Sequence, residues 1–216
     1  MIVSPGRGYV MVHAPKTGGT ALTLALEERA MADDILIGDT PKAQRRKARL
    51  KGVQTAGRLW KHSTLRDIRG LLPDAVLDGL RPILLVRNPW DRVVSYYHWL
   101  KCQTFEHPAV VAAKGLTFDA FLADGAVANS FRANPYASYV AGGRDPIFVR
   151  LEHLATDLAP VETLLGFAID MPVVNRSDRA RDWRGYYDAA GRDRVAEFCA
   201  ADISAFSYRF DGDDPA

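Results

Sequence analysis

The chain has 216 residues, of which 48% are hydrophobic and 25% are charged. This composition is ordinary for a globular protein, excludes disordered and fibrous classes, and suffices for one domain with a full core. Lys and Arg total 28 against 26 Asp and Glu, a net charge of +2 that gives no case for a dedicated nucleic-acid binder. Cys102 and Cys199 are far apart in sequence, so neither a disulfide framework nor a zinc site is expected.

No apolar run approaches the roughly 20 residues that span a bilayer, and the first predicted strand begins too near Met1 to leave room for a signal sequence. We therefore expect a cytoplasmic protein with no membrane partner and a single domain over residues 1–216. The sequence does not indicate an oligomeric state.

The first predicted elements are an apolar strand from Tyr9 to Ala14 and a helix from Thr20 to about Arg29. The glycine-rich loop between them points backbone N–H groups and the positive end of the helix dipole at one spot, which favours a bound phosphate or sulfate. Lys16 precedes Gly18 and Gly19, whereas the loop of nucleotide triphosphatases places its lysine after the last glycine. This order argues against an ordinary ATPase or kinase.

Residues 39–52 are polar and strongly basic, without apolar periodicity. One interpretation is a solvated loop. The other is an approach path for an anionic acceptor or donor, formed by Lys42, Arg45, Arg46, Lys47, Arg49 and Lys51.

A short strand is expected over residues 57–62 and a helix over residues 63–72. His62 would then precede a helix N-terminus, which disfavours the imidazolium form and leaves the ring able to accept a proton. His62 is thus the candidate general base, although a purely structural role stays open.

A second strand–helix passage begins with the apolar run from Pro82 to Arg87. Asn88 is a suitable N-cap and Pro89 a suitable first helical residue. Arg87 would lie at the carboxyl end of a strand, where ligands gather in open α/β sheets, with Ser95 two turns into the helix.

The rest of the chain predicts a helix near residues 118–122, an irregular or helical insert over 126–139, a strand over 147–151, and helices over 152–166 and 188–206. This alternation predicts an α/β fold of three layers, with a P-loop-like central parallel sheet and helices on both faces.

The sequence Pro-Lys-Thr-Gly-Gly-Thr of residues 15–20 resembles the 5′-phosphosulfate loop of sulfotransferases, which use 3′-phosphoadenosine 5′-phosphosulfate (PAPS) as donor. The run from Arg87 to Tyr97 resembles their 3′-phosphate motif. The absence of a membrane anchor suggests a compact soluble relative, bacterial in origin. The resemblance implies donor binding by Lys16, Thr17, Gly18, Gly19, Thr20, Ala21, Arg87 and Ser95.

Carbohydrate sulfotransferases of this type have a histidine base between the two motifs, where His62 lies, and Lys16 would stabilise the leaving phosphate. Residues 148–154 and 174–187 resemble later family segments less specifically, and a late loop in this family often completes the donor pocket. Ser177, Arg181 and Arg184 are the candidates there, with a solvated basic loop as the alternative. Residues 102–146 and 39–52 have no match, and both regions are expected to specify the acceptor.

The predicted function is transfer of a sulfuryl group from PAPS to a hydroxyl of a carbohydrate or similar acceptor. No acidic cluster adjoins either motif, so no metal is expected. The alternatives are a P-loop-type small-molecule kinase, a non-catalytic PAPS- or nucleotide-binding regulator, and a nucleic-acid module built on residues 39–52.

Overall fold

The computed structural model describes residues 1–174, 179–180 and 182–212. The chain divides into two compact units, which are described separately. The sheet unit contains residues 1–86 and 136–174, and the helical unit contains residues 87–135 and the described part of 175–216. The single-domain expectation stays a prediction.

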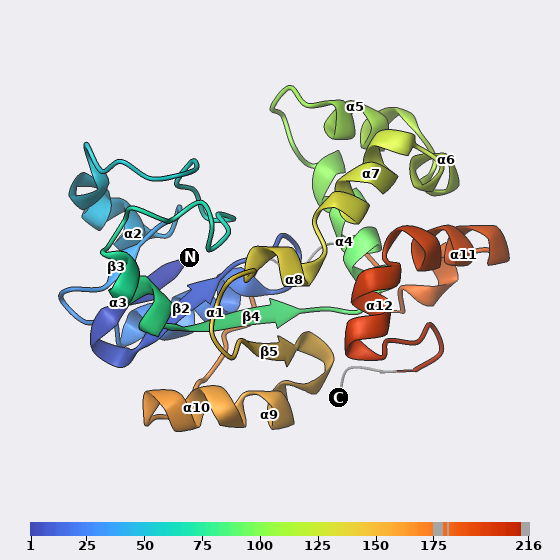
Figure 1. Cartoon of the computed structure of the whole chain (residues 1–216). Helices are drawn as coiled ribbons and strands as arrows, with labels where there is room; N and C mark the ends of the chain where they lie inside the picture. Colours follow the sequence, from blue (N-terminus) through green and yellow to red (C-terminus); the bar gives the residue numbers. More distant parts are fainter. Residues whose placement is uncertain (175–178, 181, 213–216) are drawn as a thin grey trace. The chain divides into compact units, whose positions relative to one another are not determined.

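The sheet unit is built on five strands in the order β3-β1-β2-β4-β5 (Figure 1). The strands are β1 Ile2–Ser4, β2 Tyr9–Val12, β3 Ile35–Leu36, β4 Arg81–Val86 and β5 Ile147–Arg150. β2 pairs in parallel with β4, and β4 with β5, which confirms the predicted parallel core of an α/β fold. β1 pairs antiparallel with β2 and β3, so the sheet is mixed. The sequence analysis missed β1 and β3, which are too short to show a period.

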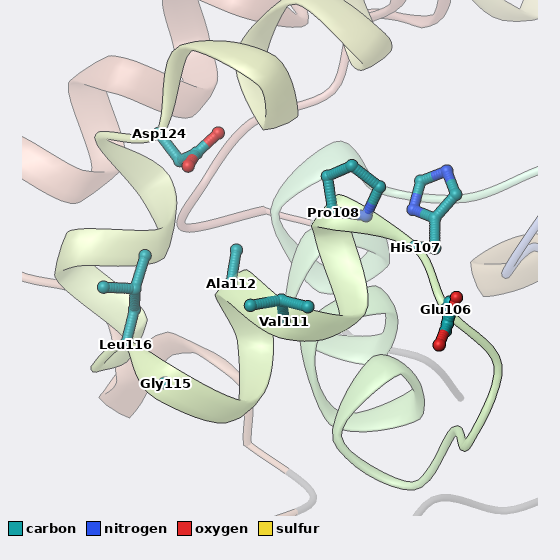
Figure 2. Close-up of a pocket in the computed structure, with 8 residues that line it drawn as sticks. All are labelled: Glu106, His107, Pro108, Val111, Ala112, Gly115, Leu116 and Asp124. Atoms are coloured by element: carbon teal, nitrogen blue, oxygen red, sulfur yellow. The ribbon is translucent and has the colours of Figure 1, made fainter.

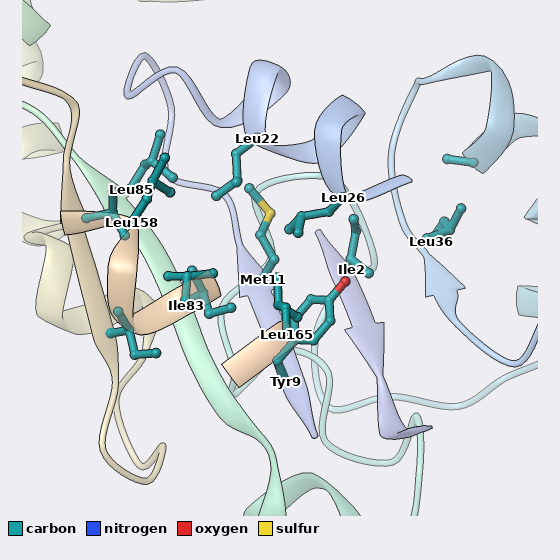
Figure 3. Close-up of a cluster of buried hydrophobic side chains, with 14 residues drawn as sticks. Ile2, Tyr9, Met11, Leu22, Leu26, Leu36, Ile83, Leu85, Leu158 and Leu165 are labelled. Atoms are coloured by element: carbon teal, nitrogen blue, oxygen red, sulfur yellow. The ribbon is translucent and has the colours of Figure 1, made fainter. Parts of the chain in front are cut away.

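One face of the sheet is covered by helices α1 (Gly19–Glu28) and α10 (Ala159–Leu165). Alternate residues of the strands point toward this face, and Figure 3 shows Met11 and Leu85 in the same cluster as Leu22 of α1. The predicted helix over residues 152–166 is divided into η3 (Leu151–His153), α9 (Leu154–Asp157) and α10.

The opposite face is covered by the segment around residues 63–72 and by the chain around α8 (Tyr136–Tyr139). The backbone N–H of Leu65 donates to the carbonyl of Tyr139 at 3.0 Å. A Cβ placed on Gly143 would lie 2.5 Å from the Pro82 side chain of β4 and 2.6 Å from that of Leu65. The predicted covering of both faces is therefore confirmed.

The predicted strand over 57–62 and helix over 63–72 are wrong, because both segments form turns. The Asp67 carboxylate accepts hydrogen bonds from the N–H and the hydroxyl of Thr64, at 2.7 and 2.9 Å. The N–H of Gly57 donates to the Asp67 carbonyl at 3.0 Å. Short polar side chains thus replace the helical hydrogen bonds that the apolar spacing suggested. The sheet unit also contains η1 (Pro5–Arg7) and α3 (Asp74–Gly79).

Residues 39–52 contain helix α2 (Pro41–Arg46) and η2 (Lys47–Leu50) rather than an irregular loop. The Thr40 hydroxyl accepts the N–H of Ala43 and donates to the Glu27 carboxylate at 2.7 Å. Ala43 is buried in the core. An N-cap and a buried apolar contact therefore help to fold this basic segment.

The helical unit begins with α4 (Pro89–Lys101), and Asn88 is its N-cap as predicted, accepting the N–H of Trp90 at 3.1 Å. Tyr97 packs against Phe118 and Phe121 in an aromatic cluster. The remaining helices are α5 (Pro108–Gly115), α6 (Phe118–Leu122), α7 (Gly125–Ala133), η4 (Arg184–Tyr186), α11 (Ala189–Phe198) and α12 (Ala200–Phe206). Within the described ranges, no helix is long and apolar enough to cross a bilayer.

Candidate functional site

The loop between β2 and α1 has the backbone geometry of an anion-binding turn. Lys16 and Gly18 both have positive φ, 66° and 83°. The Thr17 hydroxyl is buried and donates to the Ala14 carbonyl at 2.9 Å, which ties the loop to the end of the strand. Gly18 is the N-cap of α1 and provides no side-chain acceptor, so the first turn presents backbone N–H groups.

Gly19 is required by the close approach of His13. A Cβ on Gly19 would lie 2.1 Å from Cδ2 and 2.5 Å from Nε2 of the His13 ring. His13, which we expected to belong only to the strand, is thus packed directly against the first turn of α1. A glycine at position 19 is therefore needed for packing against His13, in addition to the role in donor binding that the sequence predicts.

His62 lies beside His13, although 49 residues separate them in sequence. Its Nδ1 is 2.7 Å from the His13 carbonyl oxygen, and the two ring centroids are 4.6 Å apart in an edge arrangement. Because a carbonyl can only accept, Nδ1 must carry the proton in the neutral ring. Nε2 then has the lone pair that a general base needs.

Burial lowers the pKa of His62 to about 4, opposed by the hydrogen bond to the His13 carbonyl and assisted by the charge of Lys61. Burial also holds the pKa of His13 well below its usual value. His62 is therefore neutral near pH 7, as expected. The expected cause of the lowered pKa, a helix dipole, was wrong, because no helix begins at residue 63. Desolvation lowers the pKa of His62 instead.

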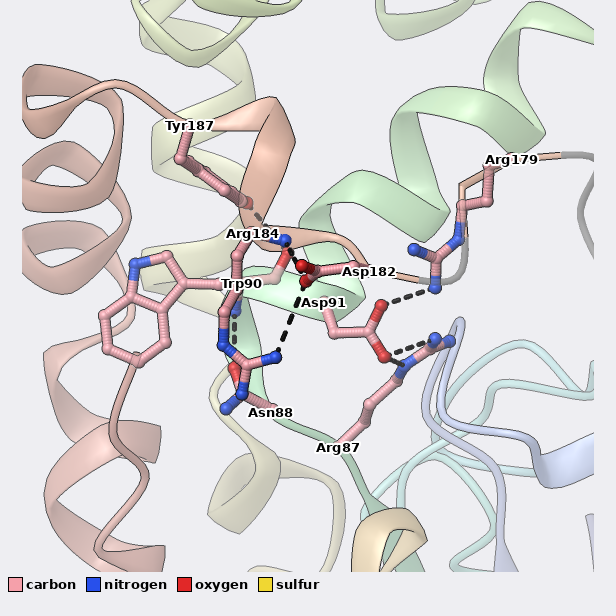
Figure 4. A network of polar contacts seen from close by, with 8 residues as sticks. All are labelled: Arg87, Asn88, Trp90, Asp91, Arg179, Asp182, Arg184 and Tyr187. Carbon is pink, nitrogen blue, oxygen red and sulfur yellow. Dashed lines mark hydrogen bonds and ion pairs between the residues drawn. The ribbon is translucent and has the colours of Figure 1, made fainter. Parts of the chain in front are cut away.

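In the helical unit, two guanidinium groups converge on one carboxylate (Figure 4). Arg87 donates from Nε and Nη2 to Oδ2 of Asp91 at 2.8 and 2.6 Å. Arg179 pairs with the other oxygen of Asp91. All three side chains are at most 13% exposed, so this cluster combines one net positive charge with low water access.

The other predicted donor residues fall into three groups. Ser95 is buried on α4, one turn after Asp91. Arg184 donates to the carbonyls of Phe210 and Gly212 at 3.0 and 3.3 Å, and so holds residues 210–212 in place. The predictions for Ser177 and Arg181 lie outside the described residues.

Half of the basic residues of segment 39–52 are bound to backbone carbonyls around the end of α1. Lys42 donates to the Glu27 carbonyl, Arg46 to those of Met31 and Asp34, and Arg49 to that of Ala32. Cations at a helix C-terminus are a stabilising device. This segment therefore does not form an approach path for anions from all six basic side chains.

The helical unit also has an open hollow of about 830 Å³ beside α5, within the stretch expected to specify the acceptor (Figure 2). It is lined by Glu106, His107, Pro108, Val111, Ala112, Gly115, Leu116 and Asp124. None of these is a predicted site residue. Within the described ranges, no cluster of three His, Cys, Asp or Glu side chains is suited to hold a metal ion.

Sequence reasoning missed His13, Asp91 and Arg179 as parts of these sites. The i,i+4 spacing of Arg87 and Asp91 on a predicted helix could have indicated their ion pair. No local signal links Arg179 to α4, or His13 to His62.

The mixed sheet with its parallel β2-β4-β5 core, and the glycine loop that leads from β2 into α1, define a sulfotransferase-like α/β fold. The crystal structure of mouse sulfotransferase SULT7A1 complexed with PAP is similar, with a TM-score of 0.50 and 13% identity. The match covers 93% of this chain and 85% of the mouse chain. No protein-family model and no curated protein sequence matches. The similarity therefore shows the fold and not the acceptor.

Gly19→Ala should lower the free energy of unfolding by about 1–3 kcal/mol, because the new methyl group overpacks against His13. Urea unfolding measures this. Gly79→Ala is the matched control, since no heavy atom lies within 4 Å of its added Cβ. The His13→Ala, Gly19→Ala double variant should be more stable than additivity predicts, and strict additivity would contradict the contact.

Stability should depend on pH through His62. Between pH 6.5 and about 4 the unfolded state protonates this histidine while the folded state does not, so stability falls as pH falls. His62→Gln keeps an amide donor but does not titrate, so its cost should be smaller at pH 5 than at pH 7.5 by about 1–2 kcal/mol. Equal costs at both pH values, measured by urea unfolding, would show that the folded pKa is not lowered.

Proposed function

We propose that this protein is a PAPS-dependent sulfotransferase that transfers a sulfuryl group to a hydroxyl of a carbohydrate acceptor. The observation that supports this best is the neutral imidazole of His62, fixed in one tautomer by the residue that packs against the glycine loop. The position of Lys16 before Gly18 and Gly19, rather than after the last glycine, favours this function over a kinase. The cytoplasmic compartment and bacterial origin rest on the sequence alone and belong to this proposal.

The glycine loop fits a phosphosulfate group. Its Gly18 cap leaves the first N–H groups of α1 without a side-chain acceptor of their own, and α1 is a ten-residue helix with a full dipole. We assign the 5′-phosphosulfate to Lys16 and to the backbone N–H groups of Thr17, Gly18, Gly19 and Thr20. The N–H of Ala21, which the resemblance also implies, donates instead to the Gly18 carbonyl at 2.9 Å.

The Arg87–Asp91–Arg179 cluster fits a second anion, the 3′-phosphate. Guanidinium groups bind phosphate through paired hydrogen bonds, and here their orientation is already fixed by Asp91. Ser95 is the hydroxyl donor assigned to the same phosphate. Ser177 and Arg184 remain donor-pocket residues by resemblance only, and the carbonyl contacts of Arg184 favour a supporting role.

The bound donor supplies an electrophilic sulfuryl group on a phosphate that can leave. His62 Nε2 takes the proton of the acceptor hydroxyl as its oxygen forms the new bond to sulfur. The bond from sulfur to the bridging oxygen of the 5′-phosphate breaks, and Lys16 with the loop N–H groups stabilises the charge that this oxygen gains. The residues of the chain position the reacting groups and neutralise the developing charge, and no metal is assigned a role.

Binding of 3′-phosphoadenosine 5′-phosphate, the expected product, tests the donor assignment. Arg87→Ala should weaken its binding by about 10–100-fold in calorimetric titration, because a charge-assisted contact is lost. Arg132→Ala is the matched control, since that arginine forms an exposed ion pair with Glu197 in the same unit. Preference for ATP with magnesium would favour the kinase, and failure to bind either nucleotide would favour a different function.

His62→Gln should reduce kcat by about 10²–10⁴-fold and leave product binding unchanged, because only proton removal is lost. His153→Gln is the control, since this histidine lies in η3, outside both PAPS motifs and outside residues 102–146. The wild-type kcat/KM should show no step near pH 6.5 from this group, because burial lowers the pKa of His62 to about 4 in the free protein. Unchanged turnover in His62→Gln would remove His62 from the base role, and nucleotide binding without any turnover in the wild type would support the regulator.

A further inference from the structure

Trp60 is 45% exposed, whereas Trp90 and Trp183 are 4% and 3% exposed. Large aromatic side chains usually bury most of their surface, so an exposed indole beside a candidate base calls for an explanation. Trp60 was not singled out by the sequence, because it stands alone in a polar segment.

The turn that holds Trp60 is rigid. The Trp60 N–H donates to the Ser63 hydroxyl at 2.9 Å, and that hydroxyl donates to the Arg58 carbonyl at 2.8 Å. The Ser63 N–H donates in turn to the Trp60 carbonyl at 3.0 Å, and Ser63 is completely buried. The exposure of the indole is therefore set by a fixed backbone.

The same turn places the indole against the candidate base. The ring centroids of Trp60 and His62 are 4.9 Å apart with an interplanar angle of 85°. A molecule that contacts the exposed indole would therefore lie near His62.

The surroundings of the indole are charged rather than apolar. The Arg58 guanidinium lies over the Trp60 ring, 5.9 Å from its centroid, so one face of the indole already has a cationic neighbour. The neighbouring Lys61 forms an ion pair with Asp39 at 2.6 Å, and both act electrostatically on His62. A phenol or a lipid alcohol needs an enclosed apolar pocket, which this open platform does not offer.

From this juxtaposition we infer that Trp60 is the stacking platform for the acceptor and that the acceptor presents a pyranose ring. One face of a pyranose consists of C–H groups that pack on an indole face, while its rim of hydroxyls suits charged neighbours. Trp60 would thus determine specificity by orienting one hydroxyl toward His62. This inference rests on the proposed sulfotransferase function.

The test is binding of labelled protein, saturated with 3′-phosphoadenosine 5′-phosphate, to an array of pyranose oligosaccharides that includes glycosaminoglycan fragments. We expect wild-type binding, at least 10-fold weaker binding by Trp60→Ala, and binding within about 3-fold of wild type by Trp60→Phe. Val76→Ala is the control, because Val76 is exposed at 38% on α3, outside the donor motifs and outside residues 102–146. Radiolabelled sulfate transfer to the best glycan should show the Trp60→Ala defect in KM rather than in kcat.

Calorimetry with the same nucleotide separates the two levels of the proposal. Lack of nucleotide binding by the wild type would overturn the sulfotransferase function itself. When the nucleotide binds normally, three results would overturn the Trp60 inference and leave the sulfotransferase function standing. These are that no glycan is bound, that Trp60→Ala binds glycans as the wild type does, or that 2-naphthol is sulfated in preference to every saccharide.

Discussion

The hydrogen bond from the His62 ring to the His13 carbonyl is the contact on which the candidate site depends. It joins the end of β2 to a turn 49 residues later and fixes three properties of the imidazole at once. The carbonyl sets the tautomer, the tautomer leaves the lone pair on Nε2, and the 2.7 Å contact fixes the plane of the ring. Since the ring of His13 packs on Gly19, the base and the glycine loop share one support.

This arrangement has a cost that the turn around His62 must offset. A partly buried imidazole loses some of the hydration that stabilises its charged form, and the lowered pKa of His62 reflects that loss. Ser63 and Asp67 hold the turn through hydrogen bonds to backbone groups on both sides of it. The same bonds leave Trp60 exposed, so the position of His62 and the exposure of the indole have one structural origin.

The elements that could be predicted are those whose signals are local. The apolar run of β4, the Asn88 cap and the glycines before α1 each specify their own backbone, and the structure has all three. The turns over residues 57–72 could not be predicted, since polar hydrogen bonds there compete with a helix-like spacing. The proximity of His62 to His13, and of Arg179 to Asp91, depends on long-range folding that no spacing reveals.

Desolvation, rather than the number of charges, would explain how a chain with a net charge of only +2 suits the highly charged donor proposed above. The most basic segment, 39–52, uses Lys42, Arg46 and Arg49 to neutralise carbonyls near the end of α1. The mostly buried Arg87 and Arg179 share one carboxylate instead, so they are oriented in advance and poorly screened by water. Two guanidinium groups held in this way attract a phosphate more strongly than a larger number of solvated lysines, because little ordering or desolvation remains to be done on binding.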